Sequence, residues 1–425
     1  MSASELWVFA GERQLGVLHD THPLSFTYDQ AWLAQADPFP IGAIALAVHT
    51  QHTPEVEACF ENLLPEGDVR DYLVKKHQTS TIFGLLAALA GDTAGGLLLL
   101  PPGQKPLPAS YVDTTWEDIA ASLTTPGASA VDIHARGARI SLAGAQDKTT
   151  LAVFDGIPML PEGTSPSTHI LKPDIYRLKK VWESAANESI VMRAAQHCGL
   201  AVAPVFYEPH TRSCVVERFD RYFVAPRQPL RLLQYDFCQL AGIPSDRKYE
   251  QDGGPCIVQC ADLIRTFSSQ PAVDLRRFVE WIFFNLYTGN NDSHAKNLSM
   301  YRLPNGAMRL TPHYDLMCTR LYPGLAQRFA LRIGGQDMPG QVGHAEVAAM
   351  ARELGMQTAF VGRLAANLAK RLPAALDTAV AELSPLLGHK GRPLAEKLVV
   401  EVKGMTRRIA QRVADPRADA EDQLA

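Results

Sequence analysis

The 425-residue sequence lacks the long apolar runs and the strong net charge that mark several protein classes. No apolar run approaches the roughly 20 residues that a bilayer-spanning helix needs, so we expect no membrane association. The first residues alternate in the manner of a strand, whereas a secretory signal would show a basic region before an apolar core. The net charge of −4 gives no global attraction to nucleic acid, so any such contact needs a local basic patch.

Cysteine is scarce and scattered along the chain. The seven cysteines are odd in number, and the closest pair, Cys256 and Cys260, has no partners at zinc-binding spacing. His294 and His313 lie in no H-E-x-x-H motif, which leaves no support for a zinc site. We therefore expect reduced thiols in a cytoplasmic protein.

The familiar glycine-rich nucleotide motifs are absent as well. The chain has no Gly-Lys dipeptide, which excludes a Walker A loop, and it has no G-x-G-x-x-G sequence. It also lacks the G-x-S-x-G elbow of the α/β-hydrolases. If the protein binds a nucleotide, other residues must hold the phosphates.

What the chain has is the composition of a packed globular protein, with 46% hydrophobic and 20% charged residues. Its length suits two or three domains. In the first hundred residues the patterns predict a hairpin over 5–20, helices over 60–73 and 82–89, and a strand over 97–100. Four prolines within 101–108 indicate a linker, so residues 1–105 are predicted to form an α+β subdomain.

The pattern changes further along the chain. We predict strands over 151–154, 169–171, 202–207 and 214–219, and a helix over 181–197 that Gly199 stops. Beyond residue 230 helices dominate, including 275–287 and several from 344 to 413, before an acidic, frayed tail after Pro416. The predicted fold class is α+β: a protein-kinase-like two-lobed fold with the N-terminal subdomain, a strand-rich N-lobe over 106–220 and an all-helical C-lobe over 221–425.

The most informative stretch is Asp292-Ser293-His294-Ala295-Lys296-Asn297, which places a carboxylate and an amide five positions apart. Phosphoryl transfer from ATP uses one carboxylate to orient the attacking hydroxyl, and an Asn with a second Asp to hold magnesium. Protein kinases use the same Asp-x-x-x-x-Asn spacing. Asp315 supplies the second carboxylate, so the set predicts a kinase that uses ATP and Mg²⁺.

Local signals bring these residues together. The apolar helix over 275–287 runs into Gly289-Asn290-Asn291, so Asp292 lies on a loop at a helix end. Asn305-Gly306 lies between two short alternating runs, which predicts a hairpin that returns Asp315 to this loop. A bare Asp-x-x-x-x-Asn is more often a turn and cap pattern, and the hairpin is the reason to prefer the site.

Two further stretches are candidate phosphate contacts. Small residues within Ser141–Lys148 would let backbone N–H groups approach phosphate oxygens, although such a stretch is more often only a tight turn before a strand. Lys172 ends a predicted strand and could reach the α/β-phosphates, with Glu188 or Glu183 to orient it. The alternative for Lys172 is a solvated lysine on an edge strand.

Other polar positions carry less weight. The strand over Val215–Asp220 runs into charged residues and could meet adenine with its backbone, or it could be an ordinary strand before a salt-bridging loop. Gln234 and Asp236 are weaker candidates at the same cleft. The last helix carries basic residues that fit a solvated face better than a nucleic-acid contact. These are Lys397, Lys403, Arg407, Arg408 and Arg412.

Taken together, these motifs resemble the HipA family of bacterial serine/threonine kinases, the toxin halves of type II toxin–antitoxin pairs. The resemblance extends from the first strand to about residue 400. It rests on residues 60–67, 141–148, 216–221, 289–297 and 312–316. One departure is Asp147, which stands where Glu is common.

The resemblance implies a role for each matching residue. Asp292 is implied as the catalytic base, with Asn297 and Asp315 as the magnesium ligands. Ser141 matches the serine that family members autophosphorylate, and the added negative charge beside a phosphate loop would repel ATP. Together with Gln234, the implied ATP-binding residues are Ala143, Gly144, Ala145, Gln146, Asp147, Lys148, Lys172, Glu217, Arg218, Phe219, His294, Ala295, Lys296, Asn297, Tyr314 and Asp315.

The family also implies partners and a cellular role. Its known targets are aminoacyl-tRNA synthetases, most famously the glutamyl enzyme, and their phosphorylation leads to growth arrest and persistence. The usual partner is a HipB-like helix-turn-helix antitoxin that binds the kinase and the operator DNA. Two alternatives stay open from the residues alone: a DNA-associated co-repressor module with weak kinase activity, and a small-molecule phosphotransferase.

Overall fold

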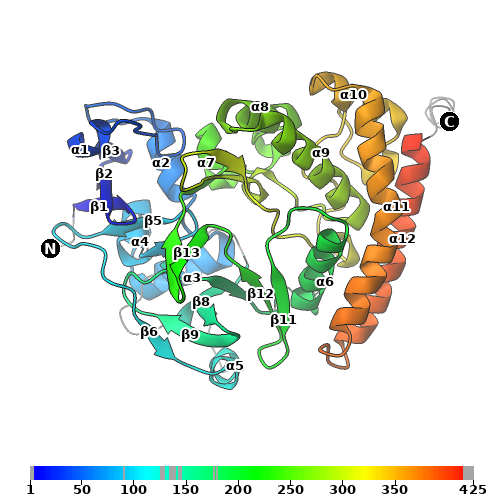
Figure 1. Cartoon of the computed structure of the whole chain (residues 1–425), viewed down its shortest axis with the longest axis horizontal. Coiled ribbons are helices and arrows are strands. Elements are labelled where there is room, and N and C mark those ends of the chain that lie inside the picture. Colours follow the sequence, from blue (N-terminus) through cyan, green and yellow to red (C-terminus); the bar gives the residue numbers. More distant parts are fainter. Residues whose placement is uncertain are drawn as a thin grey trace. The chain divides into compact units, whose positions relative to one another are not determined.

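The computed structural model describes residues 4–89, 91–124, 130–133, 140–141, 146–175, 178 and 180–414 (Figure 1). The frayed tail expected after Pro416 lies outside these residues. Contacts between Cα atoms divide the chain into two compact units. The first unit holds residues 1–172, 216–248 and 299–308, and the second holds 173–215, 249–298 and 309–425. Each unit is therefore assembled from three separate segments of the sequence.

A four-stranded antiparallel sheet opens the first unit, in the order β3-β2-β1-β5. Its strands are β1 (Glu5–Ala10), β2 (Arg13–His19), β3 (Ser25–Tyr28) and β5 (Leu97–Leu100). The predicted hairpin over 5–20 is confirmed, and its turn contains Gly11 with a φ of 57°, which glycine adopts readily. Between β3 and β5 the chain forms α1 (Gln30–Leu33), α2 (Pro54–Glu61), α3 (Gly67–His77) and α4 (Ile82–Leu89).

The single helix expected over 60–73 is wrong, because the structure divides it into α2 and α3. Pro65 lies in the break and has no N–H for a helical hydrogen bond. Asn62 follows α2, and its side-chain amide donates to the carbonyl oxygens of Ala58 (2.7 Å) and Ile243 (2.9 Å). Pro65 and the hydrogen bonds of Asn62 therefore end the helix, although the apolar periodicity alone predicts one continuous helix.

A second sheet contains the strand order β12-β10-β8-β9-β6, and β12 begins in the second unit and ends in the first. Its strands are β6 (Tyr111–Asp113), β8 (Thr149–Phe154), β9 (Ile157–Pro161), β10 (His169–Lys172) and β12 (Ser213–Glu217). Asp155 and Gly156, both with positive φ, form the tight turn between β8 and β9. The helix α5 (Trp116–Thr124) and the short turn η1 (Ala130–Asp132) precede β8, and β4 (Asp92–Thr93) pairs in parallel with β7 (Ile140–Ser141).

Shorter strands complete the first unit. They are β13 (Arg221–Ala225), β14 (Gln228–Arg231), β15 (Gln234–Asp236) and β16 (Ser299–Arg302), with β17 (Met308–Leu310) continuing into the second unit. The helix α7 (Phe237–Ala241) and the turn η2 (Ser245–Arg247) also belong here. The hairpin expected at Asn305-Gly306 is confirmed, with the Leu303 N–H donating to the Ala307 carbonyl over 2.8 Å. Strands β13 to β15 lie within the segment 221–425, for which the sequence predicts helices and the single hairpin at Asn305-Gly306.

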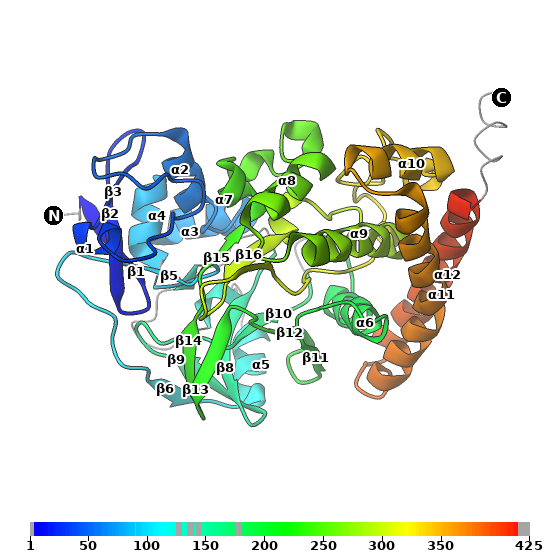
Figure 2. The ribbon, with the colours of Figure 1, turned by 45° about the horizontal axis from the view of Figure 1, so that its top comes forward.

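The second unit is mainly helical. Its helices are α6 (Ser184–His197), α8 (Ile257–Phe267), α9 (Pro271–Thr288), α10 (His344–Glu353), α11 (Thr358–Leu383) and α12 (Gly391–Ala414). It also holds β11 (Val205–Glu208) and the short turns η3 (Glu250–Asp252), η4 (Ala295–Asn297), η5 (Thr319–Leu321) and η6 (Pro339–Gln341). The long helices α11 and α12 run side by side, and both pack against α6 and α9 (Figure 2).

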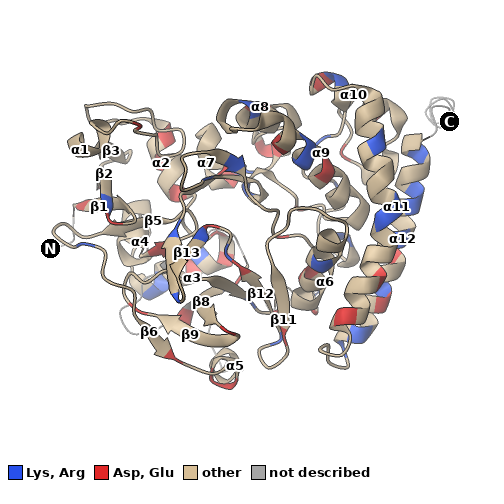
Figure 3. Ribbon diagram, in the orientation of Figure 1, with Lys and Arg blue, Asp and Glu red and all other residues tan. Residues whose placement is uncertain are grey.

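Helix α9 forms the core of the second unit. Its side chains Trp281, Phe283, Phe284 and Tyr287 are completely buried. Burying such large apolar groups fixes the helix rigidly, because aromatic side chains dominate core energetics. In contrast, α12 carries many Lys and Arg residues along its length (Figure 3). Among the described helices, none combines the length and the apolarity that crossing a bilayer requires.

Candidate functional site

The loop that follows α9 holds the candidate catalytic aspartate. Helix α9 ends at Gly289, which adopts a left-handed φ of 70° that glycine tolerates without strain. The next side chain, Asn290, donates from its amide to the Asn285 side-chain oxygen over 2.8 Å and so ties the loop back to the helix. Asn291 is held at the same time, because its backbone N–H donates to the Thr319 hydroxyl over 2.8 Å.

Asp292 is exposed, whereas residues 290, 291 and 293–299 around it are buried. The carbonyl of Asp292 accepts from the His294 N–H (3.0 Å) and from the Asn297 side-chain amide (3.0 Å). The carboxylate accepts a 2.6 Å hydrogen bond from the Tyr249 hydroxyl. The backbone on both sides is therefore fixed while the carboxylate itself faces outward, which is the arrangement that a general base needs.

Tyr314 and Asp315 are bonded to the same loop. The Tyr314 hydroxyl donates to the Lys296 carbonyl over 2.8 Å, and the Asn290 amide donates to the Asp315 carbonyl over 3.3 Å. Asp315 adopts a φ of 58°, a left-handed conformation that Asp and Asn accept more readily than most residues. The structure thus brings Asp292, Asn297 and Asp315 into one cluster of the second unit.

The neighbouring His313 is structural. It is 2% exposed, and its backbone pairs with Ala201 and Ala203 through hydrogen bonds of 2.8 and 2.9 Å. Burial lowers the pKa of His313 to about 3, so the ring is neutral at physiological pH. His313 therefore anchors the segment that leads to Asp315.

The donor set of this cluster fits a magnesium ion that is shared with a nucleotide. Mg²⁺ is usually held by one or two carboxylates together with substrate phosphates and water, and seldom by a cage of protein ligands. Within the described residues no group of three or more His, Cys, Asp or Glu side chains could hold a metal. A Mg²⁺ ion that is also bound by phosphates needs fewer protein ligands. One carboxylate from Asp315 and one amide oxygen from Asn297 would be enough.

The candidate phosphate loop is described only in part. Ala143, Gly144 and Ala145 lie outside the described residues. For Ser141 the backbone alone is described, and it pairs with Thr93 through the bridge between β4 and β7. Beyond the loop, the Asp147 carboxylate accepts a 3.0 Å hydrogen bond from the Ala130 N–H, and Gln146, Asp147 and Lys148 lead directly into β8.

Lys172 is the last residue of β10 and is 6% exposed, so it is a buried lysine and not a solvated one. Burying a lysine is costly without an anionic partner. The two glutamates considered for it belong to the second unit, and one of them, Glu183, forms a short ion pair with Arg212. Glu188, in α6, is 1% exposed.

In the segment 217–219, where β12 ends, the side chain of Arg218 stabilises the fold. Arg218 is 4% exposed and forms a bidentate pair with Asp220, with N–O distances of 2.9 and 2.7 Å. Its backbone N–H donates to the Thr168 carbonyl over 2.9 Å. Glu217 is exposed, and desolvation raises the pKa of its carboxyl. The ring of Phe219 packs edge-on against Tyr301 at 6.2 Å between centroids.

A buried ionic cluster surrounds Arg218. Asp92 lies 2.9 Å from Arg221, 3.0 Å from Arg231 and 3.6 Å from Arg218. Burial alone would raise the pKa of Asp92, but the three guanidinium groups hold it well below its ordinary value. The charged residues that follow the strand are thus a structural network of the first unit.

Gln234 and Asp236 are the first and last residues of β15. The Gln234 amide donates to the Ser299 hydroxyl over 3.2 Å, and its backbone N–H donates to Gly95. Asp236 caps α7, because its carboxylate accepts from the Gln239 N–H over 2.7 Å. Asp236 therefore stabilises the start of α7 in the first unit.

Sequence reasoning missed Tyr249, whose hydroxyl contacts Asp292. The two residues are 43 positions apart, and Tyr249 precedes the short turn η3 without any periodic pattern around it. The ring of Tyr249 also packs edge-on against His294, with 5.0 Å between centroids. No motif signals such a contact, and the fold alone brings it about.

Comparisons with known proteins identify the family. A HipA N-terminal domain matches residues 6–100, and a HipA-like C-terminal domain matches residues 140–376, more than half of the chain. The chain is 35% identical over 376 residues to a Sinorhizobium fredii protein named "Putative kinase Y4mE", covering 85% of this chain and 88% of that one. It is 30% identical over 391 residues to the "Serine/threonine-protein kinase toxin HipA" of Shewanella oneidensis, covering 88% of each chain.

The fold agrees with these matches. A solved structure of the Shewanella oneidensis HipA, HipB and operator DNA complex contains a chain that matches with a TM-score of 0.84 and 27% identity. The match covers 97% of this chain and 99% of that one. Fold and relatives together define an α+β enzyme of the kinase class. The chain belongs to the HipA family.

Proposed function

We propose that this chain is an ATP- and Mg²⁺-dependent protein serine/threonine kinase in which Asp292 is the catalytic base. The observation that carries the proposal is the exposed Asp292 carboxylate on an otherwise buried loop. The Asp292 carbonyl accepts from the Asn297 side-chain amide, and Asn290 of the same loop donates to the Asp315 carbonyl. This is the minimal set that phosphoryl transfer requires.

In this mechanism Asp292 orients the acceptor hydroxyl and accepts its proton as the new P–O bond forms. Asn297 and Asp315 would hold the metal, which would supply positive charge against the charge that develops on the phosphates. The hydrogen bond from the Asn297 amide to the Asp292 carbonyl would couple the metal side of the site to the base. Positioning is the main catalytic contribution, because the chemistry leaves little covalent work for the protein.

The remaining nucleotide contacts are part of the same proposal. We assign the phosphates to residues 143–148 and Lys172, adenine to the backbone at 217–219, and further contacts to Gln234, His294–Lys296 and Tyr314. We also keep the division into residues 1–105, 106–220 and 221–425 as a proposal.

The cellular role follows from family membership. We infer a toxin that phosphorylates an aminoacyl-tRNA synthetase, with the glutamyl enzyme as the first candidate, and thereby causes growth arrest or persistence. We assign Ser141 as the autophosphorylation site that silences the kinase. A HipB-like antitoxin, bound to operator DNA, is the inferred partner, and the matched Shewanella complex of HipA, HipB and operator DNA supports it.

Transfer of labelled phosphate from ATP tests the catalytic assignment. We expect Asp292→Asn to reduce autophosphorylation and synthetase phosphorylation by roughly a thousandfold or more, while ATP binding survives. Asp252→Asn is the matched control, because Asp252 is an exposed aspartate of the same unit in the turn η3. Retention of full transfer by Asp292→Asn would exclude this residue as the base.

The DNA-associated co-repressor remains a second candidate for the basic helix α12. Several of its basic residues have partners within the chain: Lys403 pairs with Asp377 (2.6 Å), and Lys397 lies 5.7 Å from the Trp182 ring centroid. Direct DNA binding by the isolated kinase would survive Asp292→Asn and fall steeply with salt. Absence of such binding would leave operator contact to the antitoxin.

A further inference from the structure

Asn290 lies between helix α9 and the proposed base Asp292, and it is 1% exposed. A buried side-chain amide costs free energy unless its donors and its acceptor are paired. The backbone N–H of Asn290 donates to the Asn285 carbonyl over 2.9 Å, and its carbonyl accepts from the Ser293 hydroxyl over 3.1 Å. The backbone of Asn290 is therefore held on both sides.

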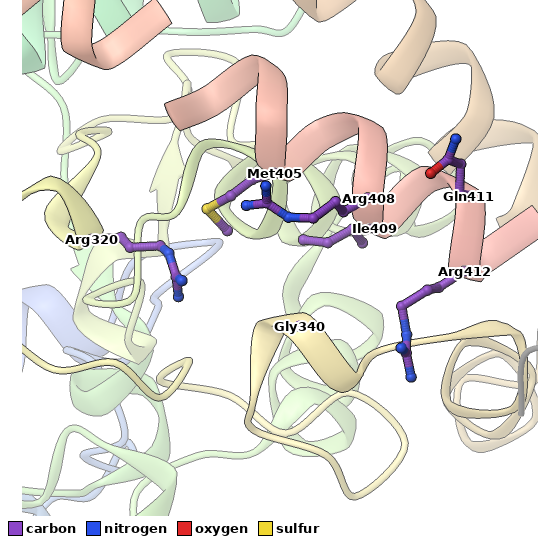
Figure 4. Close-up of a pocket in the computed structure, with 7 residues that line it drawn as sticks. All are labelled: Arg320, Gly340, Met405, Arg408, Ile409, Gln411 and Arg412. Atoms are coloured by element: carbon purple, nitrogen blue, oxygen red, sulfur yellow. The ribbon is translucent and has the colours of Figure 1, made fainter. Parts of the chain in front are cut away.

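The residue before Asn290 is fixed as well. The Arg320 N–H donates to the Gly289 carbonyl over 3.0 Å, and a Cβ on Gly289 would lie 3.1 Å from both the Arg320 Cβ and the Met405 sulfur. The free space near these two side chains is a pocket of about 340 Å³ that they line (Figure 4), whereas a side chain at position 289 would have none. The side chain of Asn290 therefore starts from a closely packed backbone.

The side-chain amide of Asn290 has three partners. Its nitrogen donates to the Asn285 side-chain oxygen (2.8 Å) and to the Asp315 carbonyl (3.3 Å). Its oxygen accepts from the Asp292 N–H over 3.4 Å. A carbonyl can only accept and a backbone N–H can only donate, so these partners determine which way round the amide lies. The short bond to Asn285 sets its orientation, and the other two lead to the proposed base and to a proposed metal ligand.

One side chain thus contacts the backbone of both Asp292 and Asp315. Asp315 needs support, because its φ of 58° lies in the left-handed region, which persists only where the surroundings hold it. Contacts of 3.3 and 3.4 Å are long for hydrogen bonds, and at catalytic sites such contacts often tighten when the substrate is bound. Because the backbone directs each carboxylate, Asn290 can set the distance between the two.

We propose that Asn290 is a positioning residue that couples the metal ligand Asp315 to the base Asp292. The inference rests on the proposed kinase function. Asparagine suits this role, because its nitrogen carries two donors beside an acceptor oxygen, whereas an ionised aspartate has no donor and serine has one. Without the amide, both carboxylates remain in the chain, but their relative position is no longer fixed from this side.

The variant Asn290→Ala tests the proposal in two assays. Isothermal titration with a non-hydrolysable ATP analogue, in Mg²⁺ and in EDTA, gives the part of the affinity that depends on the metal. Transfer of labelled phosphate gives the rate of autophosphorylation. We expect the Mg²⁺-dependent part of the affinity to fall roughly tenfold, and the rate to fall roughly tenfold to a hundredfold. Affinity in EDTA should stay unchanged, because Asn290 is not one of the proposed nucleotide contacts.

Asn62→Ala is the matched control. Asn62 is also 1% exposed, and its amide donates to two carbonyl oxygens, those of Ala58 and Ile243, in the first unit. Both substitutions remove buried hydrogen bonds, so both should lower the stability that urea denaturation measures. Asn290→Ala alone should change the dependence on Mg²⁺. Asn290→Ser, which keeps one donor, should give intermediate values, and it replaces the alanine variant if that variant does not fold.

The outcomes separate the positioning role from the kinase assignment. Unchanged Mg²⁺-dependent affinity and rate in Asn290→Ala, or equal losses in Asn62→Ala, would overturn the proposal. If instead Asp292→Asn retains full transfer, or the unmodified chain transfers no phosphate, the proposed function itself is wrong. Loss of transfer in Asp292→Asn beside an unaffected Asn290→Ala would refute the positioning role alone.

Discussion

The Tyr249 hydroxyl donates a 2.6 Å hydrogen bond to the Asp292 carboxylate, and its ring packs edge-on against His294. Both contacts lie within the second unit, although they join residues more than 40 positions apart. An exposed carboxylate would otherwise sample several rotamers. The tyrosine therefore fixes the direction of the one group on which the proposed chemistry depends.

Replacing Tyr249 by Phe tests whether this hydrogen bond positions the base. The ring and its packing survive, and only the hydroxyl is lost, so we expect kcat to fall roughly tenfold with little change in the KM for ATP. Steady-state kinetics of synthetase or peptide phosphorylation provide the measurement. A variant that is as fast as the unmodified kinase would mean that this hydrogen bond does not position the base, and a faster variant would mean that the hydroxyl blocks the acceptor position.

Gly289→Ala tests the junction between α9 and the catalytic loop. An alanine there must adopt a φ of 70° and must also crowd Arg320 and Met405 at 3.1 Å, so we expect a loss of about 1–3 kcal/mol in unfolding free energy. Urea denaturation measures it. Gly253→Ala separates the two causes, because Gly253 also has a positive φ (88°) but has open space around its Cβ position. Equal losses in both variants would show that crowding contributes nothing.

Asp92→Asn tests the buried ionic cluster of the first unit. The substitution keeps the shape of the side chain but removes one of the two carboxylates, Asp92 and Asp220, that face Arg218, Arg221 and Arg231. We therefore expect the free energy of unfolding to fall by about 3–5 kcal/mol. The matched control is Asp155→Asn, whose carboxylate is 85% exposed and lies 3.6 Å from Arg227. Exposed pairs contribute little, and we expect no measurable change there. A mild effect of Asp92→Asn would mean that water enters the cluster.

Acid sensitivity should be traceable in part to His169. Burial lowers its folded-state pKa from 6.5 to about 4, so the folded protein favours the neutral ring. The contribution to stability is therefore complete above pH 6.5 and is lost as the pH falls from 6.5 towards 4.

Because the ring is partly exposed, we expect the free energy of unfolding to fall by only roughly 1 kcal/mol at pH 5 through this group. In the variant His169→Gln the free energy of unfolding should depend less steeply on pH over this range. Denaturation at several pH values measures this slope. His389→Gln, which removes an exposed histidine, is the control. An unchanged slope in His169→Gln would show that His169 does not contribute to the acid sensitivity.

The parts of the fold that the sequence predicts well depend on local chemistry. Gly289 ends α9, and Asn305-Gly306 turns the hairpin, so the loop of Asp292 and the return towards Asp315 follow from short-range signals. The same kind of signal, Pro65, breaks the helix expected over 60–73, where the apolar pattern by itself predicts one continuous helix.

Contacts between distant segments could not be predicted in this way. The charge pattern after β12 does not reveal that Arg218 is buried against Asp92, 126 positions earlier, because a buried ion network and a polar cleft look alike in sequence. Tyr249 is hidden for the same reason. The assignments of residues 143–148, Lys172 and Ser141 remain predictions that depend on a bound nucleotide.

The most direct test of the account is a crystal structure of this chain with Mg²⁺ and a non-hydrolysable ATP analogue. We predict a metal ion held by the Asn297 amide oxygen and the Asp315 carboxylate, with the γ-phosphate within reach of a hydroxyl placed on Asp292. Density for the nucleotide away from these residues, or a metal ion that Asp315 does not touch, would contradict it.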